Sequence, residues 1–188
     1  PGIYIAYPSN ASDAKGLLKM ACRMDDPVLF MEHKGLYRQG YAATEEPDSD
    51  YIIPFGKGRL VSNGNYLTLV TWGAMVQKSV EAVQELLLEE NIVEIIDLRT
   101  LNPIDFDILE VSINKTGKVL IVHEDNLTNG PGAEISAMIS EKFFEYLDGP
   151  IKRVAAKDSP IPFNWVIEEK ILPQTKDISN AIEELLEY

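Results

Sequence analysis

The side chains of this sequence that could do chemistry gather in residues 123–135, HEDNLTNGPGAEI. His123 and Glu124 end the apolar run KVLIV, and a loop with two glycines follows them. A histidine beside a carboxylate can transfer protons or bind a metal ion. Glycines in front of a helix can let its free backbone amides hold an anion. The structural alternative is a polar strand end bonded to the next loop, followed by a tight turn.

The residue types and their spacing argue against a metal or a nucleotide in this stretch. A zinc site needs two further ligands, but the chain has one other histidine, His33, and one cysteine, Cys22. Gly130 and Gly132 lack the Gly-x-Gly-x-x-Gly spacing, and no Lys-Ser/Thr pair follows them. We therefore interpret His123 as a polar strand-end residue. Cys22 cannot form an internal disulfide and is expected in a core, in a reducing compartment.

Two further clusters carry charge. EHKGLYR, residues 32–38, gathers His33 and Arg38 after an expected strand, and IDLRTLNPID, residues 96–105, places Asp97 and Arg99 on one face of another. We interpret both as salt-bridge clusters that fix a loop or an interface. The sequence has no Gly-x-Ser-x-Gly elbow and no Cys/His dyad, so no complete catalytic apparatus is visible.

Composition limits the partners of the chain. It has 188 residues, 45% of them hydrophobic, with 17 basic and 30 acidic side chains and a formal charge of −13. Nucleic acid and anionic membrane are therefore poor partners, and a basic protein is a better one. No apolar run approaches the roughly 18–20 residues of a membrane span. The start, PGIYIAYPSN, lacks an initiator Met and a signal peptide, so we expect a fragment of a longer polypeptide.

The elements that must position these residues follow from hydrophobic periodicity. Residues 3–7 and 28–32 read as strands around a helix capped by Ser12 or Asp13, which makes one β-α-β unit. Residues 39–56 read as a linker, and residues 57–73 as a hairpin that turns at Asn63-Gly64 into a strand at 67–71.

The rest of the chain alternates helices with apolar strands. The expected helices are residues 74–90, 106–115, 132–147 and 176–186, and the expected strands are 93–98, 119–123 and 151–155. A proline-broken segment precedes the last helix. This pattern predicts an α/β fold, a three-layer α/β/α sandwich with a mainly parallel sheet. We expect domain boundaries at 1–38, 39–56 and 57–188.

Taken together, these segments resemble one family. The motifs are SNASDAKGLLKMACRMDDPVLFMEHKGLYR, LVTWGAMVQKSVEA, EIIDLRTLNPID, KTGKVLIVHED, GAEI and IPFNW with a later LP. In this order they are similar to the beta subunit of the thiamine-diphosphate 2-oxoacid dehydrogenases, over essentially the whole chain. EHKGLYR and VHED fit the branched-chain and related type better than the pyruvate type. NGPG stands where the family has a Gly-Gly-Phe-Gly type of turn.

The resemblance implies the last β-α-β part of a pyrimidine-binding domain, followed by a complete transketolase-like carboxy-terminal domain. The implied reaction of the full-length enzyme is decarboxylation of a 2-oxoacid and acyl transfer to lipoyl-lysine, with thiamine diphosphate and magnesium. The family's cofactor-activating glutamate and stacking aromatic precede Pro1. No catalytic or cofactor-binding residue is therefore carried over, and the fragment alone is expected to be inactive and free of cofactor.

Other residues match family sites. A structural potassium ion would be held by the backbone carbonyls of Ala21 and Met24 and by Asp26. Asp148 and the terminal carboxylate of Tyr188 would dock the basic subunit-binding domain of the acyltransferase core. The corner residues His123 and Glu124, with His33 and Arg38, would face an interface between subunits or domains.

The implied partners are an alpha-type subunit or domain, a second beta copy and the acyltransferase core, in the cytoplasm of a bacterium or in the mitochondrial matrix. Two alternatives stay open. One is a pure assembly domain, whose task is docking and dimerisation. The other is another transketolase-like enzyme such as transketolase itself, whose fold fits but whose motifs do not match EHKGLYR.

Overall fold

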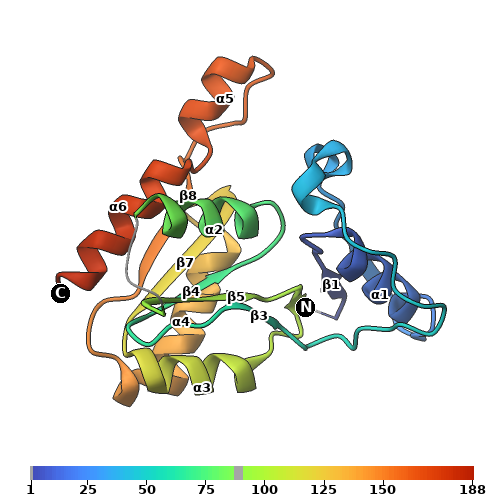
Figure 1. The fold of residues 1–188 in the computed structure, drawn as a ribbon, viewed down its shortest axis with the longest axis horizontal. Helices are drawn as coiled ribbons and strands as arrows, with labels where there is room; N and C mark the ends of the chain where they lie inside the picture. Colours follow the sequence, from blue (N-terminus) through green and yellow to red (C-terminus); the bar gives the residue numbers. More distant parts are fainter. Residues whose placement is uncertain (1, 87–90) are drawn as a thin grey trace.

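A computed structural model of the chain describes residues 2–86 and 91–188 (Figure 1). Its larger sheet has five strands in the order β3-β5-β4-β7-β8, and β3 alone is antiparallel to its neighbour. The strands are β3 (Arg59–Ser62), β4 (Leu67–Thr71), β5 (Val93–Asp97), β7 (Val119–Asn126) and β8 (Lys152–Ala156). Every residue of β4 and β5 is buried, as expected where helices cover both faces of a parallel sheet.

Helices cover the two faces of this sheet in pairs, which confirms the three-layer α/β/α sandwich. The helices are α2 (Met75–Glu85) and α6 (Thr175–Leu186) on one face, and α3 (Phe106–Thr116) and α4 (Pro131–Phe143) on the other. Successive strand residues point to opposite faces. Leu69 and Leu120 accordingly pack in the α2–α6 core, whereas Val70 and Ile121 pack in the α3–α4 core.

A smaller sheet belongs mainly to the start of the chain. Its strands are β1 (Tyr4–Ala6), β2 (Val28–Phe30) and β6 (Thr100–Asn102), in the order β2-β1-β6. β1 and β2 are parallel and joined by α1 (Ala11–Ala21), which is the expected β-α-β unit. β6 was not expected. It pairs antiparallel with β1 and so joins the small sheet to the second part of the chain.

Short elements complete the fold. These are the 3₁₀ helices η1 (Lys34–Arg38), η2 (Gly40–Ala42) and η3 (Phe144–Tyr146), and the helix α5 (Trp165–Ile171). α5 stands apart from the layers, beyond α6 and β8 (Figure 1). Among the described residues, no helix is both long and apolar enough to cross a membrane.

The expected hairpin at Asn63-Gly64 is wrong, because β3 and β4 lie on opposite sides of β5 rather than beside each other. Gly64 instead lets the chain pass close to β5. A Cβ added to Gly64 would lie 2.1 Å from the backbone nitrogen of Glu94, and the Gly64 amide donates to the Glu94 carboxylate at 3.3 Å. Asn63-Gly64 therefore lies in the connection that crosses from β3 to β4, two strands that are not neighbours in the sheet.

Element boundaries differ in other places. Asn10, and neither Ser12 nor Asp13, caps α1, since its side chain accepts from the Asp13 amide. Cys22 follows α1 and is exposed, not part of a core. The predicted helix 74–90 ends at residue 85, and residues 87–90 lie outside the described part of the chain. The predicted helix 132–147 becomes α4 followed by η3.

Candidate functional site

The most informative position for a ligand site is the carboxyl edge of the large sheet. Chain order reverses between β4 and β7, because β5 lies on one side of β4 and β7 on the other. Open α/β sheets bind ligands in the crevice at such a switch point. β7 contributes His123 and Glu124 to this edge, and the residue after β4 is Trp72. These residues therefore lie where folds of this kind carry their chemistry.

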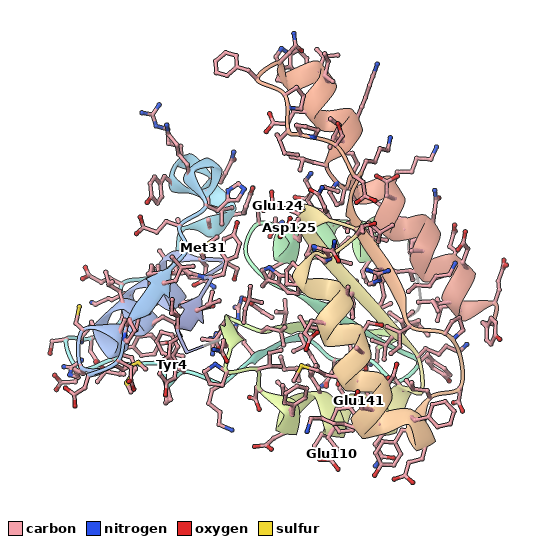
Figure 2. The ribbon with its side chains drawn as sticks, turned by 180° about the vertical axis from the view of Figure 1, so that it is seen from behind. Tyr4, Met31, Glu110, Glu124, Asp125 and Glu141 are labelled. Carbon is pink, nitrogen blue, oxygen red and sulfur yellow. The ribbon has the colours of Figure 1, made fainter. Side chains whose placement is uncertain are left out.

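Side chains from the first part of the chain occupy this edge. Glu124 lies near the end of β7, on the side that faces the η1–η2 segment (Figure 2). Its Oε1 lies 3.1 Å from His33 Nε2, and its Oε2 accepts a hydrogen bond of 3.4 Å from the Tyr7 hydroxyl. His33 precedes η1 and Tyr7 follows β1. The chain thus places its own side chains where other doubly wound folds place ligands.

The charges at this edge form an ion pair between His33, in the first part of the chain, and Glu124, in β7. The hydrogen bond to Glu124 is the main cause that raises the pKa of His33, and burial opposes it. Burial, the charge of Glu124 and its hydrogen bond raise the pKa of Tyr7. Burial also lowers the pKa of Lys78, which faces the same carboxylate. Glu124 therefore favours a protonated His33 and a neutral Tyr7.

His123 has a different environment from its neighbour. Its side chain is fully buried, stacked on Trp72 with ring centroids 5.4 Å apart and planes 7° apart. A Cβ on Gly132 would lie 2.3 Å from His123 Nε2, so glycine is required at this position of the NGPG turn. Both ring nitrogens lack a hydrogen-bond partner among the described residues, and burial lowers the pKa of His123 to about 4. The neutral imidazole of His123 is therefore enclosed, and it fills the space between the end of β7 and the start of α4.

A second cluster holds the first part of the chain to β5. An Arg99 guanidinium nitrogen lies 2.6 Å from Asp13, and one from Arg59 lies 3.2 Å from Asp97. Ser9 donates to Asp97 at 2.5 Å. Burial is the main cause that raises the pKa of Asp97. The sequence indicated that Asp97 and Arg99 share a role in fixing a loop, but not their partners, which come from distant segments.

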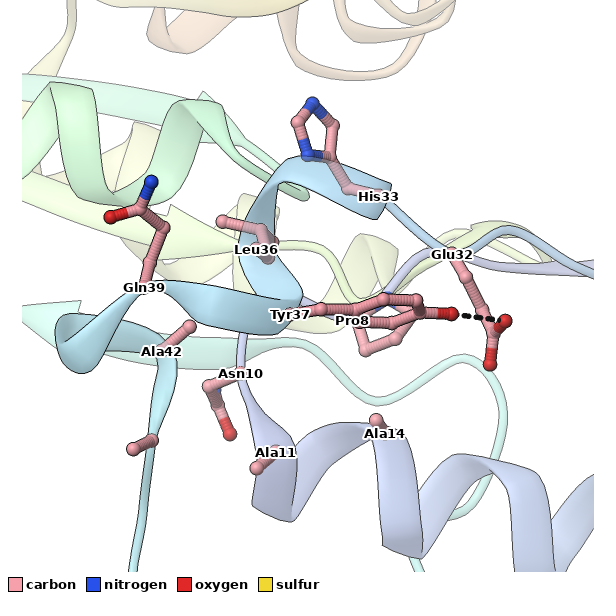
Figure 3. Close-up of a pocket in the computed structure, with 11 residues that line it drawn as sticks. Pro8, Asn10, Ala11, Ala14, Glu32, His33, Leu36, Tyr37, Gln39 and Ala42 are labelled. Carbon is pink, nitrogen blue, oxygen red and sulfur yellow. Dashed lines mark hydrogen bonds between the residues drawn. The ribbon is translucent and has the colours of Figure 1, made fainter.

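A groove lies between the start of α1 and the η1–η2 segment, with a volume of about 280 Å³ (Figure 3). We call it the α1–η groove. Its lining is mainly apolar, and the lining residues are Pro8, Asn10, Ala11, Ala14, Glu32, His33, Leu36, Tyr37, Gln39, Ala42 and Ala43. Tyr37 donates to Glu32 at 2.5 Å along one wall. EHKGLYR therefore builds both a wall of this groove and the ion pair with β7, whereas Arg38 is exposed beside it.

The two residues expected to dock a partner lie near each other at the far end of the molecule. Asp148 is exposed, and its amide donates to the carbonyl of Gly117 at 2.7 Å. Tyr188 is also exposed and packs against Gly149, since a Cβ on that glycine would lie 3.0 Å from the tyrosine ring. The fold thus brings together two residues forty positions apart in the sequence.

The residues expected to bind potassium lie where α1 ends. The Met24 amide donates to the Ala21 carbonyl at 3.2 Å, which closes a turn after the helix. Asp26 is exposed in the connection to β2. Among the described residues there is no group of three His, Cys, Asp or Glu side chains that could hold a metal ion. Any cation at this turn would depend on backbone carbonyls for most of its ligands.

Comparisons with known proteins agree with this fold. Residues 56–178 match the family model described as "Transketolase, C-terminal domain". The whole chain is 42% identical to the pyruvate dehydrogenase E1 component subunit beta of Staphylococcus epidermidis and to that of Staphylococcus aureus. It spans 57% of the length of each of these relatives. The branched-chain preference therefore gains no support from them, since both carry the pyruvate name.

One solved structure matches the chain over its whole length. The chain aligns over its full length, with a TM-score of 0.78 and 25% identity, to 58% of a chain titled "Split gene transketolase, inactive beta4 tetramer". The alignment includes the first 55 residues, which the family model does not cover. The fold of the first 55 residues is therefore part of the shared architecture.

Proposed function

This chain belongs to the transketolase C-terminal domain family, and we propose that it is the carboxy-terminal part of the beta region of a thiamine-diphosphate 2-oxoacid dehydrogenase. The observation that carries the proposal is 42% identity, over all 188 residues, to pyruvate dehydrogenase E1 beta subunits. The full-length enzyme would decarboxylate a 2-oxoacid and transfer the acyl group to lipoyl-lysine. Thiamine diphosphate would supply the electron sink for the decarboxylation.

At the switch point of the large sheet, side chains of this chain occupy the position where a doubly wound fold would hold a cofactor. The carboxyl edge of the large sheet is filled by Tyr7 and His33. We propose that the cofactor is held outside this chain, between the preceding part of the full-length protein and an alpha-type subunit.

We further propose that Asp148 and Tyr188 dock the basic subunit-binding domain of an acyltransferase core. Their exposure and proximity support this role, as does the acidic balance of the chain. Exposed charges at the rim of an interface mainly increase the association rate and the specificity. Asp148→Lys should therefore weaken docking several-fold at low salt and less at high salt, measured by surface plasmon resonance. Glu110→Lys, an exposed change on α3, is the matched control.

The turn after α1 would complete a structural potassium site in the full-length protein, with Ala21, Met24 and Asp26 as ligands. Carbonyl and carboxylate oxygens suit a hard cation, and the turn exposes Asp26. Thermal melting of the full-length protein in potassium and in sodium chloride tests this proposal. Asp26→Ala should remove a potassium-specific gain in melting temperature, and an equal gain in both proteins would contradict it.

The central experiment compares the 188-residue chain with the reconstituted enzyme, which contains the preceding half and an alpha-type subunit. Calorimetric titration with thiamine diphosphate and magnesium should give no heat for the chain and micromolar-range binding for the enzyme. The enzyme should then decarboxylate pyruvate or a branched-chain 2-oxoacid. A cofactor-loaded enzyme that transfers ketol groups between sugars instead would contradict the proposal and favour transketolase. Since the relatives are bacterial, we propose the bacterial cytoplasm as its location, ahead of the mitochondrial matrix.

A further inference from the structure

A cavity lies between the end of β8, α5 and the start of α6, and we call it the α5–α6 pocket (Figure 1). Its volume is about 470 Å³, which falls within the roughly 300–1,000 Å³ of ligand pockets. All the residues that line it lie between positions 127 and 177, inside the segment 56–178 that matches the family model. The pocket is therefore built by the large-sheet domain of this chain and not by the first part of the chain.

Basic side chains dominate the charge of this pocket. Four of them line it, and they are Arg153, Lys157, Lys170 and Lys176. The three lysines form no ion pair with a carboxylate of the described residues. The chain as a whole has 17 basic and 30 acidic side chains, so the pocket reverses the overall balance. Because a cleft lined by one sign of charge concentrates the opposite ion, this pocket favours an anion.

Two carboxylates, Glu169 and Asp177, also line the pocket, but they leave its positive charge in place. Asp177 belongs to the capping box of α6, where its Oδ2 accepts from the Gln174 amide at 2.9 Å. Glu169 is exposed to solvent, which screens its charge. The first amides of α6 lack partners within the helix, and the helix dipole adds positive potential at the same end.

Hydrogen bonds hold the walls of the pocket in place. A guanidinium nitrogen of Arg153 donates to the Leu127 carbonyl at 2.7 Å, which fixes this cation beside the end of β7. Lys78, on α2, donates to the Pro173 carbonyl at 2.8 Å and so holds the connection between α5 and α6. A ligand therefore meets a pocket that is already formed, and it loses less free energy in ordering the protein.

We propose that the α5–α6 pocket binds a small phosphate monoester. A phosphate dianion has enough oxygens to contact an arginine, a lysine and a helix N-terminus together, which a single carboxylate has not. Ile171, Leu172 and Pro173 give the pocket an apolar wall, against which the organic part of the ester packs. The net charge of −13 repels a long polyanion, so the ligand is a small molecule. This binding site goes beyond the proposed function, since it needs neither the decarboxylation nor another subunit.

An NMR titration of the ¹⁵N-labelled 188-residue chain with phenyl phosphate tests the site. We expect a dissociation constant on the order of 0.5 mM at low salt, with the largest shift changes at the amides of Thr175 and Lys176. Inorganic phosphate should bind several-fold more weakly, phenol should cause no saturable change, and added sodium chloride should weaken binding of the ester. Absence of saturation by about 10 mM phenyl phosphate, or equal shifts with phenol, overturns the proposal.

Charge substitutions locate the binding. Lys170→Glu should raise the dissociation constant about tenfold, because it replaces an attraction by a repulsion, and the circular dichroism spectrum should not change since Lys170 is exposed. Lys142→Glu is the matched control, because it alters the net charge equally at an exposed position on α4, which covers the opposite face of the sheet from α6. If both variants weaken binding equally, the overall charge of the chain and not this pocket attracts the ester, and the proposal is wrong.

A substitution in the opposite sense should strengthen binding. Glu169→Gln removes a carboxylate from the pocket and should lower the dissociation constant two- to threefold, whereas Glu141→Gln, exposed on α4, should change it very little.

The reconstituted enzyme separates this site from the cofactor site. Lys170→Glu should leave its micromolar-range affinity for thiamine diphosphate unchanged. Loss of cofactor binding in this variant overturns the proposal, because it assigns the pocket to thiamine diphosphate.

Discussion

His33 Nε2 lies 3.1 Å from Glu124 Oε1, although 91 positions separate the two residues in the sequence. This contact joins the segment before η1 to the end of β7, and the Tyr7 hydroxyl bonds to the same carboxylate. Leu36, in η1, packs against the core between α2, α6 and the sheet. The first part of the chain is therefore fixed to the carboxyl edge of the large sheet by charge and by packing.

Glu124→Gln should remove the pH dependence of this contact. The pKa of His33 is raised in the folded protein, so the pair contributes stability below the ordinary value of about 6.5 and loses it as pH rises through the raised value. We expect the substitution to lower the free energy of unfolding by about 1 kcal/mol at pH 6 and by less at pH 9. Urea unfolding at both pH values measures this, and an NMR titration should show a lower pKa of His33.

The control for Glu124→Gln is Glu110→Gln, an exposed carboxylate on α3 (Figure 2). It changes the net charge equally but lies away from His33. Its effect on stability should be small and the same at both pH values. If the two variants show the same pH dependence, the pair with His33 is not the cause.

The ion cluster at β5 should be essential for stability. Asp13→Ala leaves Arg99 without the carboxylate that it contacts at 2.6 Å, and both side chains are largely buried. Breaking one partner of a buried pair costs about 3 kcal/mol or more, because the other charge stays desolvated. Urea unfolding should show that loss. Asp13→Ala/Arg99→Ala should lose clearly less than the sum of the single variants, because it leaves no isolated charge.

An exposed pair supplies the comparison. Lys57 lies 3.3 Å from Asp107, whose side chain is 88% exposed, so Asp107→Ala should change stability very little. If Asp13→Ala lowers the free energy of unfolding no more than Asp107→Ala does, solvent screens the charges of the cluster at β5.

His123 should make the protein sensitive to acid. Its pKa is lowered to about 4, so the unfolded chain binds a proton on His123 more readily than the folded protein. Stability from this group is complete above pH 6.5 and is lost as pH falls, by roughly 3 kcal/mol at pH 4. His123→Leu should reduce that loss, measured as the difference in unfolding free energy between pH 7 and pH 4. His33→Leu is the matched control, since the pKa of His33 is shifted in the opposite direction.

The sequence was sufficient to predict the four parallel strands of the large sheet, because burial dominates there, but not that β3 pairs with β5. β4, β5 and the first part of β7 are buried and rich in apolar residues, and the helices between them have regular apolar faces. β6 was missed because three residues with a polar end carry no periodic signal, and its pairing with β1 joins segments far apart in the chain. α5 was missed because its apolar side chains face solvent instead of a core.

The site was less predictable than the fold. Spacing placed Asp97 and Arg99 on one strand face, but their partners Asp13 and Arg59 have no sequence signal that links them to β5. His123 and Glu124 are adjacent in the sequence, yet one is enclosed by Trp72 and the other bonds to another segment. Strand alternation makes the side chains of His123 and Glu124 point to opposite sides, and this can be predicted from the sequence. Which segments of the chain cover each side of the sheet edge is determined only by the assembled fold.

Gly117→Ala should lower both the stability of the fold and the affinity for the docking partner. Gly117 ends α3 with φ of 68°, in the left-handed region that costs other residues about 1–2 kcal/mol. An added Cβ would also lie 2.2 Å from a carboxylate oxygen of Asp148, so this side chain must move. We expect the variant to unfold at lower urea concentration and to bind the subunit-binding domain several-fold more weakly. Gly40→Ala, where a Cβ meets nothing within 4 Å, should change neither. Lower stability with unchanged docking would show that Asp148 does not anchor the partner.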